Sequence, residues 1–119
     1  MAKYTNPTEN FVSESGRSQQ LSLEGEPLRL DFAAHLGFVG KNRVEFSPRE
    51  WALICYFDAH RSEALSYDTI RRNVFHNLEL RKNTVVVHVL RINKKLKTAD
   101  CCQRIEAVLG FGYRFMSGN

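Results

Sequence analysis

The segment from Asn83 to Leu96, NTVVVHVLRINKKL, constrains the fold of this chain most, because its composition and its spacing predict different structures. Threonine and valine favour strands, and three of the valines are consecutive. A half-buried strand would alternate polar and apolar residues, whereas the apolar residues here recur at helical intervals. These residues are Val85, Val89, Ile92 and Leu96. We therefore predict a helix over about 84–97, with Asn83 as its N-cap and lysines near its C-terminus.

The predicted helix has a second face of mixed chemistry. This face carries Asn83, Val87, Leu90, Arg91 and Lys94. Between Arg81 and Lys97 there are six basic residues and no acidic one. The chain as a whole is asymmetric in the same sense, because residues 1–40 carry three basic and five acidic side chains, and residues 41–119 carry fourteen and eight. This charge pattern predicts a polyanion-binding surface, with a solvated face that aids solubility as the alternative.

Length and composition fit one globular domain. The chain has 119 residues, of which 43% are apolar and 25% are charged, as in ordinary soluble domains. It has no apolar run of about 18 residues and no signal-peptide pattern, so we expect a cytoplasmic protein that does not contact a membrane. Residues 1–20 lack apolar periodicity, which predicts a flexible polar tail followed by a single domain over residues 21–119.

No pattern in the chain predicts catalysis or a bound metal. The cysteines, Cys55, Cys101 and Cys102, are odd in number and two of them are vicinal, so we interpret all three as reduced thiols. The histidines have no cysteine or carboxylate at ligand spacing, and a structural hydrogen bond best explains His88. No nucleophile has a base at a recognisable spacing, so we expect neither an enzyme nor a cofactor.

The remaining segments predict short strands, two further helices and a hairpin. Alternating residues in LSLEG, PLRLDF and HLGFVGKNRVEF suggest a small antiparallel sheet. Ser47, followed by proline and then Glu50, forms a capping-box pattern that starts a helix ending near His60. Ser66 caps a second, shorter helix, and CQRIEAVLGFGYRF has the pattern of two strands around a glycine turn. We predict an α+β winged helix, with an N-terminal antiparallel sheet, a three-helix core and a C-terminal β-hairpin wing at about 104–115.

Three segments resemble the DNA-binding domain of OmpR/PhoB-type response regulators. FSPREWALICYF is similar to the segment that opens the family's first helix, TVVVHVLRINKKL to its recognition helix, and IEAVLGFGYRF to the end of its wing. The three segments occur in the family order across residues 27–116. The resemblance implies a hairpin strand that pairs back with the N-terminal sheet, and binding as a homodimer to direct-repeat sites in double-stranded DNA. We expect the chain to lack the receiver domain that usually accompanies this family.

The resemblance and the helical pattern together indicate the residues that contact DNA. They are Asn83, Thr84, Val87, Leu90, Arg91, Asn93, Lys94, Lys95, Tyr113 and Arg114. Arg91 is the best candidate for a bidentate contact with guanine, and Val87 for a contact with a thymine methyl group. The N-terminal residues of the helix and its lysines suit phosphates. The resemblance implies that Tyr113 and Arg114 lie near phosphates or support the wing.

Four positions depart from the family pattern. Val86, Leu90, Asn93 and Leu109 stand where the family commonly has charged residues. Their substitution predicts weaker or differently specific binding, because each lost arginine contact is worth about 1–3 kcal/mol. The alternative hypothesis is a winged-helix protein-interaction module that modulates other regulators or RNA polymerase. RNA polymerase is also a candidate partner of the DNA-bound protein, through the loop at residues 76–83.

Overall fold

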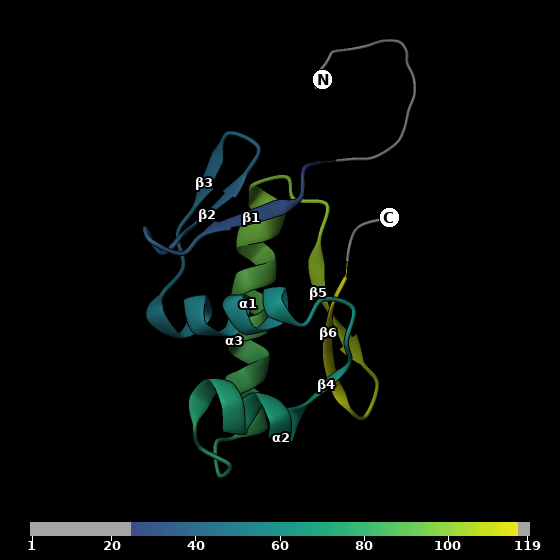
Figure 1. Ribbon diagram of the computed structural model, residues 1–119. Coiled ribbons are helices and arrows are strands. Elements are labelled where there is room, and N and C mark those ends of the chain that lie inside the picture. The colour runs from purple at the N-terminus through teal and green to yellow at the C-terminus, as the bar shows by residue number, and fades with distance from the viewer. Residues whose placement is uncertain (1–24, 117–119) are drawn as a thin grey trace.

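The computed structural model describes residues 25–116, and it begins with a three-stranded antiparallel sheet (Figure 1). Its strands are β1 (Leu28–Asp31), β2 (Leu36–Val39) and β3 (Asn42–Val44), in the order β1-β2-β3. The pairing of Leu28 with Val39, and of Gly37 with Val44, sets the register. This sheet confirms the prediction from PLRLDF and HLGFVGKNRVEF. The predicted tail at residues 1–20 and most of LSLEG lie outside the described residues.

Helix α1 (Pro48–Ala59) begins where the capping pattern predicted. The Ser47 hydroxyl accepts a hydrogen bond from the Glu50 backbone N–H at 3.2 Å, and the Glu50 carboxylate accepts one from the Ser47 N–H at 2.9 Å. These two bonds satisfy amide donors that have no partner within the helix. The helix ends at Ala59, in agreement with the predicted end near His60, which is the C-cap and whose N–H bonds to the Phe57 carbonyl.

The second helix is shorter and less regular than a single α-helix. Ser66 caps α2 (Tyr67–Ile70), as predicted, and its hydroxyl accepts from the Thr69 N–H at 3.0 Å. The chain then continues as the π-helical turn η1 (Arg71–Phe75) and leaves it through His76, which has a left-handed backbone with φ of 56°. Such a wide turn was not predicted, because nothing in the local sequence distinguishes it from an ordinary helical turn.

Helix α3 (Lys82–Thr98) confirms that spacing overrides the strand preference of its valines. Its four predicted core residues are all buried, each at most 2% exposed. The predicted N-cap was wrong, since the cap is Arg81, without a side-chain bond, and Asn83 lies inside the first turn. The helix starts early because the backbone N–H of Thr84 already bonds to the Arg81 carbonyl at 3.0 Å. No helix within residues 25–116 has the length and apolarity needed to cross a membrane.

The C-terminal hairpin belongs to a second sheet. Its strands, β5 (Arg104–Val108) and β6 (Gly112–Met116), join the two-residue β4 (Leu65–Ser66) in the order β4-β6-β5. The implied pairing of the hairpin with the N-terminal sheet was therefore wrong, because β4 occupies that edge of β6. Gly112 permits this arrangement, since a Cβ atom there would lie 1.9 Å from the Leu65 carbonyl oxygen. Strand order, helices and hairpin together give the predicted winged-helix fold.

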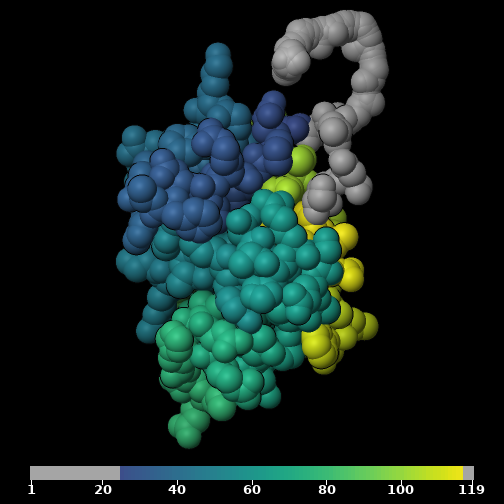
Figure 2. All heavy atoms as spheres, viewed as in Figure 1, coloured from purple at the N-terminus to yellow at the C-terminus, as the bar shows by residue number. Residues whose placement is uncertain are grey.

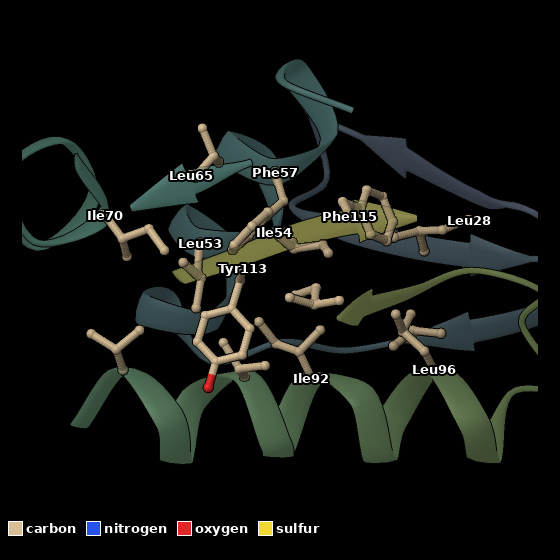
Figure 3. Packing of buried hydrophobic residues seen from close by; sticks show 14 of the residues in the cluster. Leu28, Leu53, Ile54, Phe57, Leu65, Ile70, Ile92, Leu96, Tyr113 and Phe115 are labelled. Atoms are coloured by element: carbon tan, nitrogen blue, oxygen red, sulfur yellow. The ribbon is translucent and has the colours of Figure 1, made fainter. Parts of the chain in front are cut away.

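One apolar core joins these elements. Figure 3 shows the α1 side chains Leu53, Ile54 and Phe57 in one cluster with Phe115 of β6 and the α3 side chains Ile92 and Leu96. Phe57 and Phe115 are the largest fully buried side chains. In the space-filling view the N-terminal sheet, α1 and α2 follow one another along the molecule, with the wing at one edge (Figure 2). The core therefore holds α3 from one side and leaves its opposite face for other contacts.

Candidate nucleic-acid interface

The outward face of α3 combines free cations with apolar side chains. Leu90 is 62% exposed, Arg91 and Lys94 are exposed beside it, and Val87 is half-buried. Within residues 25–116, neither Arg91 nor Lys94 forms an ion pair with an acidic side chain. Uncompensated cations next to apolar groups suit a surface that contacts both phosphates and base edges.

The N-terminus of α3 adds two cations that the predicted site did not include. Arg81 and Lys82 are both exposed, and the Lys82 ammonium lies 4.5 Å from the centre of the Tyr67 ring. They extend the basic surface from α3 towards the start of α2. The sequence did contain a sign of these two cations, because the segment from Arg81 to Lys97 has no acidic residue. The helical pattern, however, pointed to positions after Lys82.

Lys95 lies on one flank of α3, where the protein itself uses its charge. Its ammonium donates to the Glu50 carboxylate at 2.5 Å and to the Glu45 carbonyl at 2.9 Å. Glu50 is only 3% exposed. Burial acts to raise the pKa of its carboxyl, but hydrogen bonds from Lys95 and Ser47 and the charge of Lys95 outweigh it and leave the pKa below its ordinary value. Lys95 therefore holds α3 against α1 and the end of β3, a role that its sequence position did not predict.

Asn93 lies on the other flank of α3 and holds the wing. Its amide nitrogen donates to the Ile105 carbonyl at 2.8 Å, and its amide oxygen accepts from the Ile105 N–H at 2.9 Å. Ile105 belongs to β5, the outer strand of its sheet, whose free edge would otherwise leave these backbone groups unpaired. Asn93 thus supplies the bonds of a missing neighbouring strand and sets the wing against α3.

The two predicted wing residues differ in their surroundings. Tyr113 is buried and 7% exposed, with its ring edge-on to Tyr67 at a centroid distance of 5.6 Å. Burial, with a smaller contribution from the neighbouring Tyr67 hydroxyl, raises the pKa of Tyr113 to about 12. Tyr113 was expected either to lie near phosphates or to support the wing, and its buried position favours support of the wing. Arg114 is half-buried on β6, and its Nε has no hydrogen-bond partner within residues 25–116.

Thr84 and His88 belong to the framework of α3. The Nδ1 atom of His88 lies 2.7 Å from the Thr84 carbonyl oxygen, one turn earlier in the helix, and its ring packs edge-on against Phe75. This confirms the structural hydrogen bond expected for His88. Thr84 is half-buried and Asn83 is exposed, both in the first turn of the helix.

The tip of the wing is apolar. Leu109 is fully exposed, at 101%, and Phe111 is 46% exposed. From the sequence, Leu109 was noted only as a departure from the arginine of the family pattern, and the exposure of Phe111 was not predicted. Exposure of a turn residue depends on how far the hairpin projects, which the local sequence does not determine. This surface therefore combines a face of α3 with mixed chemistry and an apolar wing tip.

Other chemistry has little support within residues 25–116. No group of three or more histidine, cysteine, aspartate or glutamate side chains is placed there to hold a metal ion. Cys55, Cys101 and Cys102 are free. Burial, with a smaller contribution from Asp58, raises the pKa of Cys55 to about 11, which keeps it a poorly nucleophilic thiol.

Comparison with known proteins agrees with this geometry. The family described as "Transcriptional regulatory protein, C terminal" matches residues 40–115. The phosphate regulon regulator PhoB of Escherichia coli is 30% identical over 94 residues, which cover 78% of this chain and 41% of PhoB. The response regulator PmrA of Pseudomonas aeruginosa is 31% identical over 100 residues, covering 83% and 43%. This chain thus spans less than half the length of these relatives.

Solved structures show the same fold. The DNA-binding domain of the response regulator AdeR, in complex with an intercistronic region, superposes with a TM-score of 0.69 at 21% identity, covering 77% of this chain and 96% of that domain. The DNA-binding domain of CadC from E. coli gives 0.68 at 22% identity, covering 77% and 88%. With the family match over residues 40–115, these observations establish that the chain belongs to the OmpR/PhoB-type family of transcriptional regulatory C-terminal domains.

Proposed function

We propose that this protein is a sequence-specific, double-stranded DNA-binding transcription regulator. Helix α3 lies in the major groove, and the wing contacts the backbone or the minor groove. The observation that carries the proposal is the outward face of α3, where Arg91 and Lys94 have no ion-pair partner within residues 25–116 and flank the exposed Leu90. The same proposal places the protein in the cytoplasm, together with its DNA.

Within the proposed complex, the side chains divide by chemistry. Arg91 donates to O6 and N7 of a guanine, while Val87 and Leu90 contact thymine methyl groups. The phosphates are contacted by residues at the N-terminus of α3, by the exposed lysine of its outward face and by the wing arginine. These residues are Arg81, Lys82, Asn83, Thr84, Lys94 and Arg114.

Membership of the family also motivates a proposal about partners. We propose that two copies bind side by side to direct-repeat sites, and that the loop at residues 76–83 contacts RNA polymerase. This loop exposes Leu78, at 52%. It is also held in place, because the Arg71 side chain donates from Nε to the Leu80 carbonyl at 2.8 Å. An ordered loop with an exposed apolar residue suits a protein contact.

The test selects binding sites from a pool of random duplexes and measures affinity against salt. We expect affinity to fall with rising salt, because bound lysines and arginines release counterions from DNA. Arg91→Ala should lower affinity for the selected site by about 1–3 kcal/mol and relax its specificity, whereas Lys94→Ala should weaken binding to all sequences similarly. Arg29→Ala is the matched control, because it removes an exposed arginine from β1, outside α3 and the wing.

The second candidate function is a protein-interaction module, and the exposed Leu90 favours it. Unchanged DNA affinity in Arg91→Ala and Lys94→Ala, together with loss of a protein partner in Leu90→Glu, would support this function. Binding to DNA that does not respond to salt would contradict the first proposal, since phosphate contacts are its main source of affinity.

A further inference from the structure

The tip of the wing exposes two large apolar side chains, one on each side of Gly110 in the sequence. Leu109 is fully exposed and Phe111 is about half exposed, and the turn between them is open, since a Cβ on Gly110 would meet no atom within 4 Å. Single exposed apolar residues are common, but two large ones within one hairpin turn are less ordinary. The core does not use these side chains, so their exposure requires another explanation.

The tip is held rigidly. The backbone N–H of Phe111 donates to the Val108 carbonyl at 2.9 Å, and its carbonyl accepts from the Tyr67 N–H at 3.2 Å. Next to the turn, Gly112 pairs with Ser66 of β4, and near the other end of the hairpin Ile105 is bonded to Asn93 of α3. Because the tip is fixed relative to α2 and α3, its apolar side chains approach a ligand at a defined position, and little conformational entropy is lost on binding.

The surroundings of the tip favour a polyanion. Lys82 lies over the Tyr67 ring, next to the backbone contact with Phe111. Two carboxylates of the elements that adjoin the tip, α2 and β5, are already paired. Asp68 accepts from Arg71 at 2.8 Å, and Glu106 accepts from Arg104 at 2.6 Å. An apolar tip beside a free cation fits nucleic acid better than a lipid or an acidic protein surface, because DNA offers apolar base faces between its phosphates.

We propose, on the basis of the proposed DNA-binding function, that Leu109 enters the minor groove as an apolar wedge, supported by Phe111, and bends the DNA. A leucine has no donor for the acceptors at the floor of the groove, so its favourable contact is with base faces that partly unstack. Pyrimidine–purine steps unstack most readily, so the wedge selects sites with such a step below the wing. Specificity at that step then comes from deformability, without a hydrogen bond to the bases.

The experiment compares wild type, Leu109→Ala and Leu109→Arg on a duplex of about 40 base pairs selected by the wild-type chain from a random pool, long enough to cover the site and its flanks. Energy transfer between dyes at the two ends reports bending. We expect Leu109→Ala to bind about tenfold more weakly, the effect of losing a few buried methyl-sized groups, and to leave the DNA straight. Leu109→Arg should keep its affinity, steepen the salt dependence by about 0.9 in the log–log slope, and also leave the DNA straight.

The control variant is Leu90→Ala, which removes an equally apolar side chain from α3. It should weaken binding but leave the bend of the bound duplex unchanged. Equal bending by wild type and Leu109→Ala overturns the wedge while the proposed DNA-binding function survives. If the wild-type chain selects no duplex, both proposals are overturned. The wedge is also overturned if Leu109→Ala bends the duplex as the wild type does but self-associates differently. That result assigns the tip to contacts between copies of the chain.

Discussion

Replacing Lys95 by methionine should destabilise the fold. It should also reverse the sign of the pH dependence that Glu50 contributes to the stability. The substitution keeps most of the side-chain volume but removes the ammonium that pairs with Glu50 at 2.5 Å. Glu50 keeps its capping bonds to Ser47, yet its charge remains buried without a counterion. A buried charge that has lost its partner is costly because the protein interior solvates it poorly.

The expected cost follows from the exposure of the two partners. Breaking a fully buried ion pair by removing one partner costs about 3–5 kcal/mol. The Glu50 side chain is 4% exposed but that of Lys95 is 38% exposed, so water screens part of the interaction. We therefore expect Lys95→Met to lower the free energy of unfolding by about 2–3 kcal/mol at neutral pH. Lys94→Met, which removes an exposed lysine that has no ion pair within residues 25–116, should change this free energy by less than about 0.5 kcal/mol.

The pH dependence distinguishes this mechanism from simple loss of packing. In the wild type the folded-state pKa of Glu50 is lowered, so its contribution to stability is complete above the unfolded value of about 4.3 and is lost as pH falls through the folded pKa. In Lys95→Met, burial dominates and raises the folded pKa. Its destabilisation should therefore be largest at neutral pH and should shrink as pH falls towards about 4.3.

The assay is urea unfolding followed by circular dichroism, at several pH values from about 7 down to about 4. Glu50→Gln provides a second reference, because glutamine can keep the capping bond while the charge is gone. In the double variant Glu50→Gln/Lys95→Met, the extra pH dependence of Lys95→Met should disappear. A destabilisation of Lys95→Met that is constant over this pH range would refute the reasoning, since it would show that the charge of Glu50 is not involved.

Three further predictions concern the wing and the half-buried thiol of Cys55. Asn93→Leu should lower the free energy of unfolding by about 2–3 kcal/mol and speed hydrogen exchange at the Ile105 amide, because two backbone groups lose their partner; unchanged exchange would contradict this role. Gly112→Ala should destabilise by more than about 3 kcal/mol in thermal unfolding, since its Cβ would overlap the Leu65 carbonyl. Cys55 should react with iodoacetamide far more slowly at pH 8 than an unperturbed thiol, because its pKa of about 11 leaves little thiolate.

Features determined by local chemistry were predictable from the sequence. The capping box at Ser47 and Glu50, and the apolar spacing of α3, depend on residues within a few positions of one another. The true start of α3 at Lys82 was missed because it is determined by the path of the preceding loop. The strand β4 was missed because two residues carry no pattern of their own, and they form a strand only where β6 lies beside them.

The same distinction explains what the sequence could predict about the side chains of α3 and what it could not. A helical wheel identifies the direction in which each side chain of α3 leaves the helix, but not the element that it meets. Asn93 and Lys95 leave towards opposite flanks, where β5 and the capped end of α1 bind them. The face between them is narrow and partly apolar, so few hydrogen-bond donors remain to read bases. In the proposed complex with DNA, this face relies more on methyl contacts and DNA shape than on polar contacts, which is why Leu90 and Leu109, departures from the family pattern, are informative residues to change.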